Sequence, residues 1–207
     1  MTEILLTIDN TKVSAEEGGT ILQAARNAGS YIPAHCTYPG LPSAYDMEAR
    51  TTIFRDGKPL ENTNPGKEFE GCQLCVVDVV GKGITLACNT PVRDGLIAYT
   101  NTLPVQELRQ KNLARILARH PHTCLVCPQR EGCDSLLCSY NVPRGERCCW
   151  KFNNCELRKV TDYIGIKEDG EVYVPKNLPI VTNEPLILFD YNLCIGCLRC
   201  VRVCQDG

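Results

Sequence analysis

Fifteen cysteines among 207 residues are the side chains most able to do chemistry in this sequence. They fall into four groups along the chain, and three of the groups have spacings that suit metal ligation. The chain begins Met1-Thr2-Glu3 without the basic segment of a secretory signal, so we expect a cytoplasmic protein whose thiols stay reduced. In that compartment clustered cysteines are better explained as metal ligands than as disulfides, and an odd number of cysteines fits paired disulfides poorly.

The first group consists of Cys36, Cys72, Cys75 and Cys88. The pair Cys72-x2-Cys75 sets two thiolates on one tight loop, and four thiolates suit a [2Fe–2S] cluster. A structural zinc ion with four cysteine ligands is the alternative. Zinc sites usually recruit a second close pair, whereas Cys36 and Cys88 stand alone in the sequence, so the spacing favours the cluster.

The second group is a compact H-x3-C-x2-C-x5-C block formed by His120, Cys124, Cys127 and Cys133. One imidazole and three thiolates complete the ligation of either a [4Fe–4S] cluster or a zinc ion, and the spacing does not decide between them. In a cluster, a neutral imidazole in place of an anionic thiolate should raise the reduction potential, as histidine ligation does in Rieske centres. His122 is either the competing ligand or a surface histidine beyond the end of a helix.

The last group, a C-x2-C-x2-C-x3-C run, has the spacing of bacterial ferredoxin [4Fe–4S] sites and consists of Cys194, Cys197, Cys200 and Cys204. In ferredoxins with two clusters, the fourth cysteine of such a run ligates the other cluster. The first three cysteines lack an obvious fourth ligand in this chain, and Cys204 lacks a partner cluster. We therefore expect the polypeptide to continue beyond Gly207.

The remaining group lies in a basic stretch and consists of Cys138, Cys148, Cys149 and Cys155. Its spacing matches no common ligand pattern, so the alternatives are free thiols and an additional [4Fe–4S] cluster. Nearby cations favour thiolate and would offset the negative charge of a cluster; they are Arg144, Arg147, Lys151 and Arg158. The same cations are also typical of a solvated face or of a docking surface for an acidic partner.

Several short elements are expected to position these ligands. Ile4, Leu6 and Ile8 alternate as in a strand, residues 12–15 are the returning strand of a hairpin, and residues 51–60 form a second hairpin around Asp56-Gly57. A helix is expected over 20–28, with Thr20 as its N-cap and Gly29 as its stop. A longer helix begins at Pro104 and ends before Pro121, with Arg109 among the basic residues between its apolar positions.

The charge of the chain limits the classes of function. With 24 acidic and 22 basic side chains the net charge is −2, which excludes a general binder of polyanions such as nucleic acid. No stretch reaches the 18 or more apolar residues that a membrane span needs. No G-x-G-x-x-G motif follows a strand, and there is no P-loop, so we expect no complete active site here. Arg199 and Arg202, beside the ferredoxin run, could tune a potential, dock a partner or simply face solvent.

Taken in order, these motifs make the sequence resemble a known arrangement of iron–sulfur sites. The resemblance rests on segments 19–25, 31–36, 71–79 and 87–88, then on the His120 block, on Pro175–Ile180 and on the ferredoxin run. They are similar to the iron–sulfur module that opens the large iron–sulfur subunit of respiratory complex I. The same module opens [FeFe]-hydrogenases, diaphorase subunits of NAD-reducing hydrogenases and some formate dehydrogenases.

The resemblance implies an α+β chain of three segments. Residues 1–100 would be a β-grasp ferredoxin-like domain with [2Fe–2S] on Cys36, Cys72, Cys75 and Cys88. Residues 101–160 would be a small helical domain with [4Fe–4S] on His120, Cys124, Cys127 and Cys133, and they would include the extra cysteine-rich stretch. Residues 161–207 would begin a ferredoxin-like [4Fe–4S] domain. The implied cofactors are one [2Fe–2S] cluster and two or more [4Fe–4S] clusters.

Two departures from that family stand out. The interval between Cys36 and Cys72 is much longer, which we attribute to an inserted loop that contains the Asp56-Gly57 hairpin. The cysteine-rich stretch from Cys138 to Cys155 is also outside the common pattern. Similar stretches occur, by resemblance, in anaerobic proteins that fuse this module to a flavin-dependent NAD(P)H oxidoreductase domain.

The function that this resemblance implies is an electron relay. Its partners would be a flavoprotein subunit or fused domain that oxidises NAD(P)H and a second redox subunit, with no nucleic acid and no membrane span. Two alternatives are kept: a segment of a catalytic chain, such as an [FeFe]-hydrogenase or a formate dehydrogenase, and a structural zinc module that binds other proteins.

Overall fold

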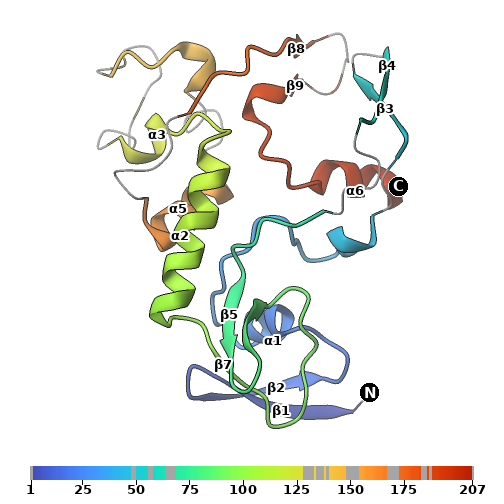
Figure 1. The fold of residues 1–207 in the computed structure, drawn as a ribbon, viewed down its shortest axis with the longest axis vertical. Coiled ribbons are helices and arrows are strands. Elements are labelled where there is room, and N and C mark those ends of the chain that lie inside the picture. The colour runs from blue at the N-terminus through green and yellow to red at the C-terminus, as the bar shows by residue number, and fades with distance from the viewer. Residues whose placement is uncertain are drawn as a thin grey trace.

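The computed structural model has a mixed α+β fold with a sheet at one end, a helical middle and a C-terminal segment that returns toward the sheet (Figure 1). It describes residues 2–47, 50–55, 58–63, 69–127, 133, 138, 140–147, 154–166, 173–182, 186 and 188–206. The predicted α+β class is confirmed.

The sheet has five strands in the order β2-β1-β7-β5-β6. Its strands are β1 (Glu3–Ile8), β2 (Thr11–Glu16), β5 (Val76–Val79), β6 (Gly83–Leu86) and β7 (Ile97–Tyr99). β1 runs parallel to β7 and the other neighbours are antiparallel, which is the β-grasp arrangement. Ile4, Leu6 and Ile8 are buried as their alternation predicts, because successive side chains of a strand point to opposite faces.

One short helix, α1 (Ile21–Asn27), packs its apolar side into the same core. Thr20 caps it as predicted: its Oγ1 accepts a hydrogen bond from Gln23 N at 3.3 Å, and Gln23 Oε1 accepts one from Thr20 N at 2.9 Å. Gly29 follows the C-cap with φ of +74°, a left-handed conformation that suits glycine. The N-cap and the C-cap thus set where this helix begins and ends, and the segment that carries Cys36 follows it.

The long interval between Cys36 and Cys72 contains a separate two-stranded sheet. It consists of β3 (Thr52–Arg55) and β4 (Lys58–Glu61), which pair antiparallel and stand apart from the main sheet (Figure 1). The predicted second hairpin is therefore present, although its Asp56-Gly57 turn lies outside the described residues. A 3₁₀ turn, Ala44–Asp46, precedes it and sets Tyr45 near the cysteines.

The helical middle is built on α2 (Leu103–Leu117), which has Pro104 in its first turn and ends before Pro121. It packs against α5 (Glu156–Ile164), and a second core forms from Leu74, Leu113, Leu117, Leu125, Leu157 and Val160. α5 crosses residue 160, where the expected second segment ends and the third begins. Arg109 of this helix is buried, with only 2% of its surface exposed, which helical spacing alone does not predict.

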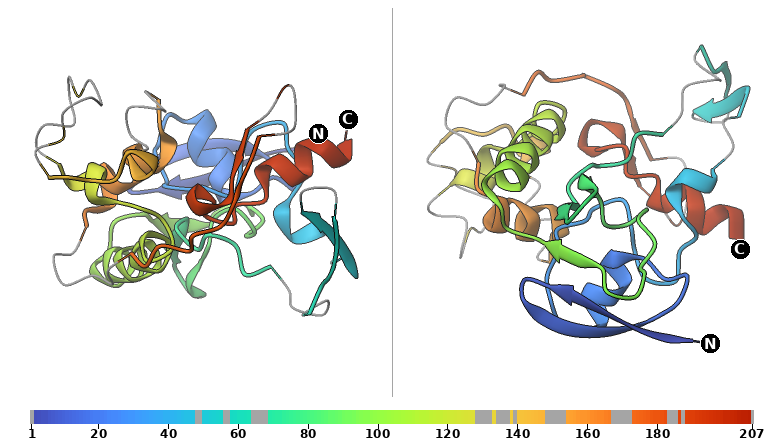
Figure 2. Two further views of the ribbon diagram at one scale, coloured as in Figure 1. Left: turned by 90° about the horizontal axis from the view of Figure 1, so that it is seen from above. Right: turned by 60° about the horizontal axis from the view of Figure 1, so that its bottom comes forward.

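The C-terminal segment returns from the helical middle to the segment around Cys36 (Figure 2). Its elements are β8 (Ile180–Val181), β9 (Phe189–Asp190), a 3₁₀ turn Tyr191–Leu193 and α6 (Arg199–Asp206). Two further short elements, α3 (Thr123–Val126) and the 3₁₀ turn Arg144–Glu146, lie between α2 and α5 in the sequence. Across the described ranges, no helix is long and apolar enough to cross a bilayer.

Candidate metal centre

The thiols of the first cysteine group come together as two pairs. The Cys72 thiol donates a hydrogen bond to the Cys36 sulfur, and this bond is the main reason that the pKa of Cys36 falls to about 6. The Cys75 thiol donates in the same way to Cys88, whose pKa is also lowered. The pairs adjoin, because Cys36 and Cys88 interact electrostatically, as do Cys72 and Cys75. Two thiolates for each of two irons is the ligation of a [2Fe–2S] cluster.

Hydroxyl and amide groups surround these sulfurs. The Thr37 hydroxyl lies 3.9 Å from Cys36 Sγ and also bonds to Cys88, while the Tyr45 hydroxyl bonds to Cys88 and to the Glu70 carbonyl oxygen at 3.3 Å. The backbone N–H of His35 donates to Cys72 Sγ at 3.4 Å. Burial is the main cause of the raised pKa of Tyr45, followed by the nearby cysteines, so the hydroxyl keeps its proton and remains a donor. Hydrogen bonds to sulfur tune cluster potentials.

The Cys72–Cys75 loop is held from the helical middle by α2. Arg109 donates from Nε to the Leu74 carbonyl oxygen at 3.2 Å and from Nη2 to the Val76 carbonyl oxygen at 2.7 Å. Asn112 Nδ2 donates to the Gln73 carbonyl oxygen at 2.8 Å. Strand β7 pairs with β5 only at Asp78 and Val79, so it offers no N–H to the carbonyl oxygens of Leu74 and Val76. Arg109 supplies the donors for these two oxygens instead.

The segment around Cys36 is held from the opposite end of the chain by α6. Arg202 is 1% exposed, and its guanidinium donates to the carbonyl oxygens of Cys36 and Pro42, the latter at 2.6 Å. Arg202 thus lies inside the protein, so simple solvation, one of the sequence-based interpretations, is wrong for this residue. The cysteine loops are therefore fixed by one buried arginine from each of the two segments that follow.

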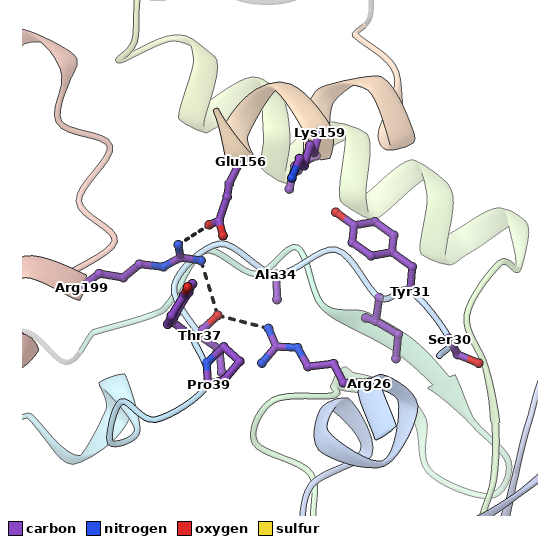
Figure 3. A pocket seen from close by; sticks show the side chains of 12 residues that line it. Arg26, Ser30, Tyr31, Ala34, Thr37, Pro39, Glu156, Lys159 and Arg199 are labelled. Atoms are coloured by element: carbon purple, nitrogen blue, oxygen red, sulfur yellow. Dashed lines mark hydrogen bonds and ion pairs between the residues drawn. The ribbon is translucent and has the colours of Figure 1, made fainter. Parts of the chain in front are cut away.

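A cavity of about 340 Å³ marks the junction of these segments. Figure 3 shows Arg199, on α6, forming an ion pair with Glu156 of α5 and reaching toward the loop after Cys36. Its Nη2 donates to the Thr37 carbonyl oxygen at 3.4 Å, and Arg26 Nη2 donates to the same oxygen at 3.2 Å. α6 is therefore tied to both the [2Fe–2S] segment and the helical middle.

The His120 block lies at the far end of α2. His120 is 6% exposed, its Nδ1 has no hydrogen-bond partner among the described residues, and burial lowers its pKa to about 4. A buried neutral imidazole with an unsatisfied nitrogen fits a metal ligand. His122 is half-exposed and its Nδ1 already contacts the Leu117 and His120 carbonyl oxygens at 3.0 and 3.2 Å, so water can satisfy its other nitrogen.

The three cysteines of this block occupy different positions. Cys124 lies on α3 and packs against the second core, Cys127 follows the helix, and Cys133 is exposed. Within the described ranges, no three ligating side chains converge on a point where a single ion would sit. The assignment of these residues to a cluster thus stays a prediction.

The ferredoxin run is a curled segment followed by α6. Gly196 and Leu198 have left-handed φ angles of +74° and +57°, which turn the backbone between the cysteines. Burial raises the pKa of Cys197, and the nearby Cys200 and Cys194 raise it further, which shows that the three thiols lie within electrostatic reach of one another. Cys204 lies one turn beyond Cys200 on α6 and is exposed.

The cysteine-rich stretch is only partly described. Cys148 and Cys149 lie outside the described residues. The pKa of Cys138 is lowered, chiefly by the backbone N–H of Val142 and also by Arg147, so its environment favours thiolate as the nearby cations predict. Cys155 is the N-cap residue of α5 and packs against the second core. A cluster in this stretch stays a prediction.

One buried histidine next to the first site is not predicted from the sequence. His35 is buried, its Nδ1 has no partner among the described residues, and burial followed by the charge of Arg199 lowers its pKa to about 4. It interacts electrostatically with His120 and so lies within electrostatic reach of the second group. Only its position before Cys36 could have marked it, and a lone histidine is a weak signal.

Two protein-family models match segments that contain the first cysteine group and the ferredoxin run. Residues 1–103 match the model of the 2Fe-2S iron-sulfur cluster binding domain, and residues 187–207 match that of the 4Fe-4S binding domain. The chain thus carries a 2Fe-2S cluster binding domain at its start and a 4Fe-4S binding domain at its end. The zinc alternative is set aside for the first group and the ferredoxin run, because the matched families bind iron–sulfur clusters.

Several curated proteins are similar to nearly the whole module. One NADH-quinone oxidoreductase subunit of Rhizobium meliloti is 27% identical over 98% of the chain, and NADP-reducing hydrogenase subunit HndD of Solidesulfovibrio fructosivorans is 28% identical over 99%. The mitochondrial NADH-ubiquinone oxidoreductase 78 kDa subunit of Neurospora crassa is 30% identical over 99%. The module spans only 19%, 28% and 22% of these relatives, respectively.

A solved structure shares the fold. A chain from the crystal structure of an NAD+-reducing [NiFe]-hydrogenase in the H2-reduced state aligns with a TM-score of 0.66 and 23% identity. The alignment covers 99% of the module and 67% of that chain. At this identity the likeness shows the fold alone.

Proposed function

We propose that this module relays single electrons between an NAD(P)H-linked flavin site and a second redox centre in an oxidoreductase complex. The observation that carries the proposal is the pairing of Cys36 with Cys72 and of Cys75 with Cys88, at a site joined by buried arginines to the two segments that follow. Clusters bound at these sites would supply one-electron oxidation and reduction without a substrate pocket.

The proposed ligands are the groups that the sequence predicts. The [2Fe–2S] cluster would be held by Cys36, Cys72, Cys75 and Cys88, and the first [4Fe–4S] cluster by His120, Cys124, Cys127 and Cys133. Another would be held by Cys194, Cys197 and Cys200 with a ligand from elsewhere, Cys204 serving a further cluster. The chain's part is to hold the sulfurs in place, exclude water and tune potentials through hydrogen bonds and charge.

The partners and the compartment belong to the same proposal. Similar proteins are named as subunits of NADH-quinone oxidoreductases and of an NADP-reducing hydrogenase, which supports a flavoprotein donor and a second redox subunit as partners. We place the protein in the cytoplasm, where thiols stay reduced. A segment of a catalytic chain is the second candidate, supported by the match to HndD, of which the module is 28%.

The test uses the protein isolated without air together with its natural partners. Addition of NADH or NADPH is expected to produce the EPR signals of the reduced clusters. In the Cys75→Ala variant, the signals of the clusters beyond the [2Fe–2S] site should appear much more slowly. Clusters that NADH and NADPH leave oxidised, although dithionite reduces them, would contradict the proposed donor.

A further inference from the structure

Arg202 is a buried cation that touches the first site from another segment. It lies on α6, between Cys200 and Cys204, and its Nη2 donates to the carbonyl oxygen of Cys36. Its Nη1 donates to the Pro42 carbonyl oxygen at 2.6 Å, and Nε reaches the carbonyl oxygen of Leu198 at 3.4 Å. All of these partners are neutral carbonyl groups, and among the described residues no carboxylate pairs with this guanidinium.

A buried charge without a partner of opposite sign is costly, so negative charge is expected close to Arg202. Two other arginines that join these segments, Arg199 and Arg109, differ from it. Arg199 forms an ion pair with Glu156, and Arg109 also receives support from the Tyr163 side chain. A negative charge within reach of Arg202 is that of the Cys36 thiolate, because the guanidinium donates to the carbonyl oxygen of that same residue.

We propose that Arg202 raises the reduction potential of the [2Fe–2S] site, so that the potential at this site depends on the docking of the helix that carries Cys200 and Cys204. This inference rests on the proposed function. Reduction adds one electron and leaves the site more negative. A fixed cation therefore stabilises the reduced form more than the oxidised form, and it does so strongly because water is excluded around it.

The docking of α6 has a structural consequence as well. Arg202 is separated by about 160 positions in the sequence from the residues Cys36 and Pro42 that it contacts. Folding of the last segment therefore completes the surroundings of a ligand set near the start of the chain. Loss of the segment's own cluster should loosen α6 and act on the [2Fe–2S] potential through Arg202. Arg202 thus links two cluster sites.

The experiment is an anaerobic potentiometric titration of the cluster-loaded chain, followed by the EPR signal of the reduced [2Fe–2S] site. Four proteins are compared: the unaltered chain, Arg202→Gln, Arg202→Lys and Lys82→Gln. Lys82 is an exposed cation in the turn between β5 and β6, so its variant removes the same charge far from the buried contact. Arg202→Lys keeps the charge and loses the planar fork of donors.

In Arg202→Gln we expect the equilibrium constant for reduction to fall at least about tenfold, which is about 59 mV for one electron. Arg202→Lys and Lys82→Gln should stay within about threefold of the unaltered chain. An Arg202→Gln protein that titrates like Lys82→Gln overturns the inference and leaves the proposed function standing. An unaltered chain without a [2Fe–2S] signal overturns the proposed function first.

A variant that does not retain its cluster is also decisive. If Arg202→Gln loses iron and sulfide, the measurement moves to Arg202→Lys, which must load and titrate close to the unaltered chain if the charge is what matters. An Arg202→Lys protein that also fails to load, or that titrates more than tenfold away, assigns the effect to geometry and overturns the role of charge.

Discussion

Arg109 offers the sharpest test of how the helical middle supports the cysteine loop. Replacing it by methionine keeps most of the side-chain volume but removes the donors to the Leu74 and Val76 carbonyl oxygens, at 3.2 and 2.7 Å. Leu74 and Val76 are buried, so water cannot easily replace the lost donors. Each buried acceptor left without a partner costs about 1–3 kcal/mol, so the two carbonyl oxygens together cost about 2–6 kcal/mol, and the relief of no longer burying the cation offsets part of that sum.

We therefore expect Arg109→Met to lower the free energy of unfolding by about 3 kcal/mol. The assay is urea unfolding of the metal-free chain under reducing conditions, followed by circular dichroism. The midpoint should fall while the dependence on urea is unchanged, because the surface exposed on unfolding is the same. Lys111→Met is the matched control, since Lys111 is exposed on the same helix and its loss should change stability by less than about 0.5 kcal/mol. Equal stabilities for the two variants would refute the reasoning.

Further predictions concern the ligands and their surroundings. Cys75→Ala should abolish the [2Fe–2S] EPR signal and spare the [4Fe–4S] signals, whereas Cys124→Ala should do the reverse; loss of all signals in either variant would count against separate sites. His120→Cys should retain a cluster with a lower potential, because a thiolate adds negative charge, and an unchanged redox titration would argue against His120 as the ligand. Tyr45→Phe removes the hydroxyl that bonds to Cys88 and should lower the [2Fe–2S] potential; an equal or higher potential in the titration would contradict that role. Gly71→Ala should destabilise the site in thermal melts, because Gly71 has a φ of +75° and an added Cβ would overlap the Tyr45 hydroxyl; an unchanged melting temperature would argue against this tight packing.

Local patterns were enough to predict the elements of the sheet and the helix cap. Alternation placed Ile4, Leu6 and Ile8 in a strand, and the Thr20 cap with Gly29 bounded α1 correctly, because these signals lie within a few residues of one another. Cysteine spacing indicated which thiols belong together. It could not show that Cys36 pairs with Cys72 across the inserted hairpin, since that contact depends on the whole fold.

The two buried arginines show where sequence patterns stop. Arg109 lies four residues from Val105 and four from Leu113, on the apolar side of α2, but helical spacing alone cannot distinguish a buried cation from an exposed one at the edge of that side. Arg202 looks like an ordinary solvated residue of an amphipathic helix. Its burial follows from a contact with Cys36 and Pro42 that no local pattern records.

The most direct test of the central claim is a count of metal and sulfide bound through the first four cysteines. Iron, zinc and acid-labile sulfide are measured in the unaltered chain and in Cys75→Ala, both prepared without air. The proposed [2Fe–2S] site predicts that the variant carries about two irons and two sulfides fewer per chain. A variant that instead lacks one zinc ion, with its sulfide unchanged, would contradict the claim.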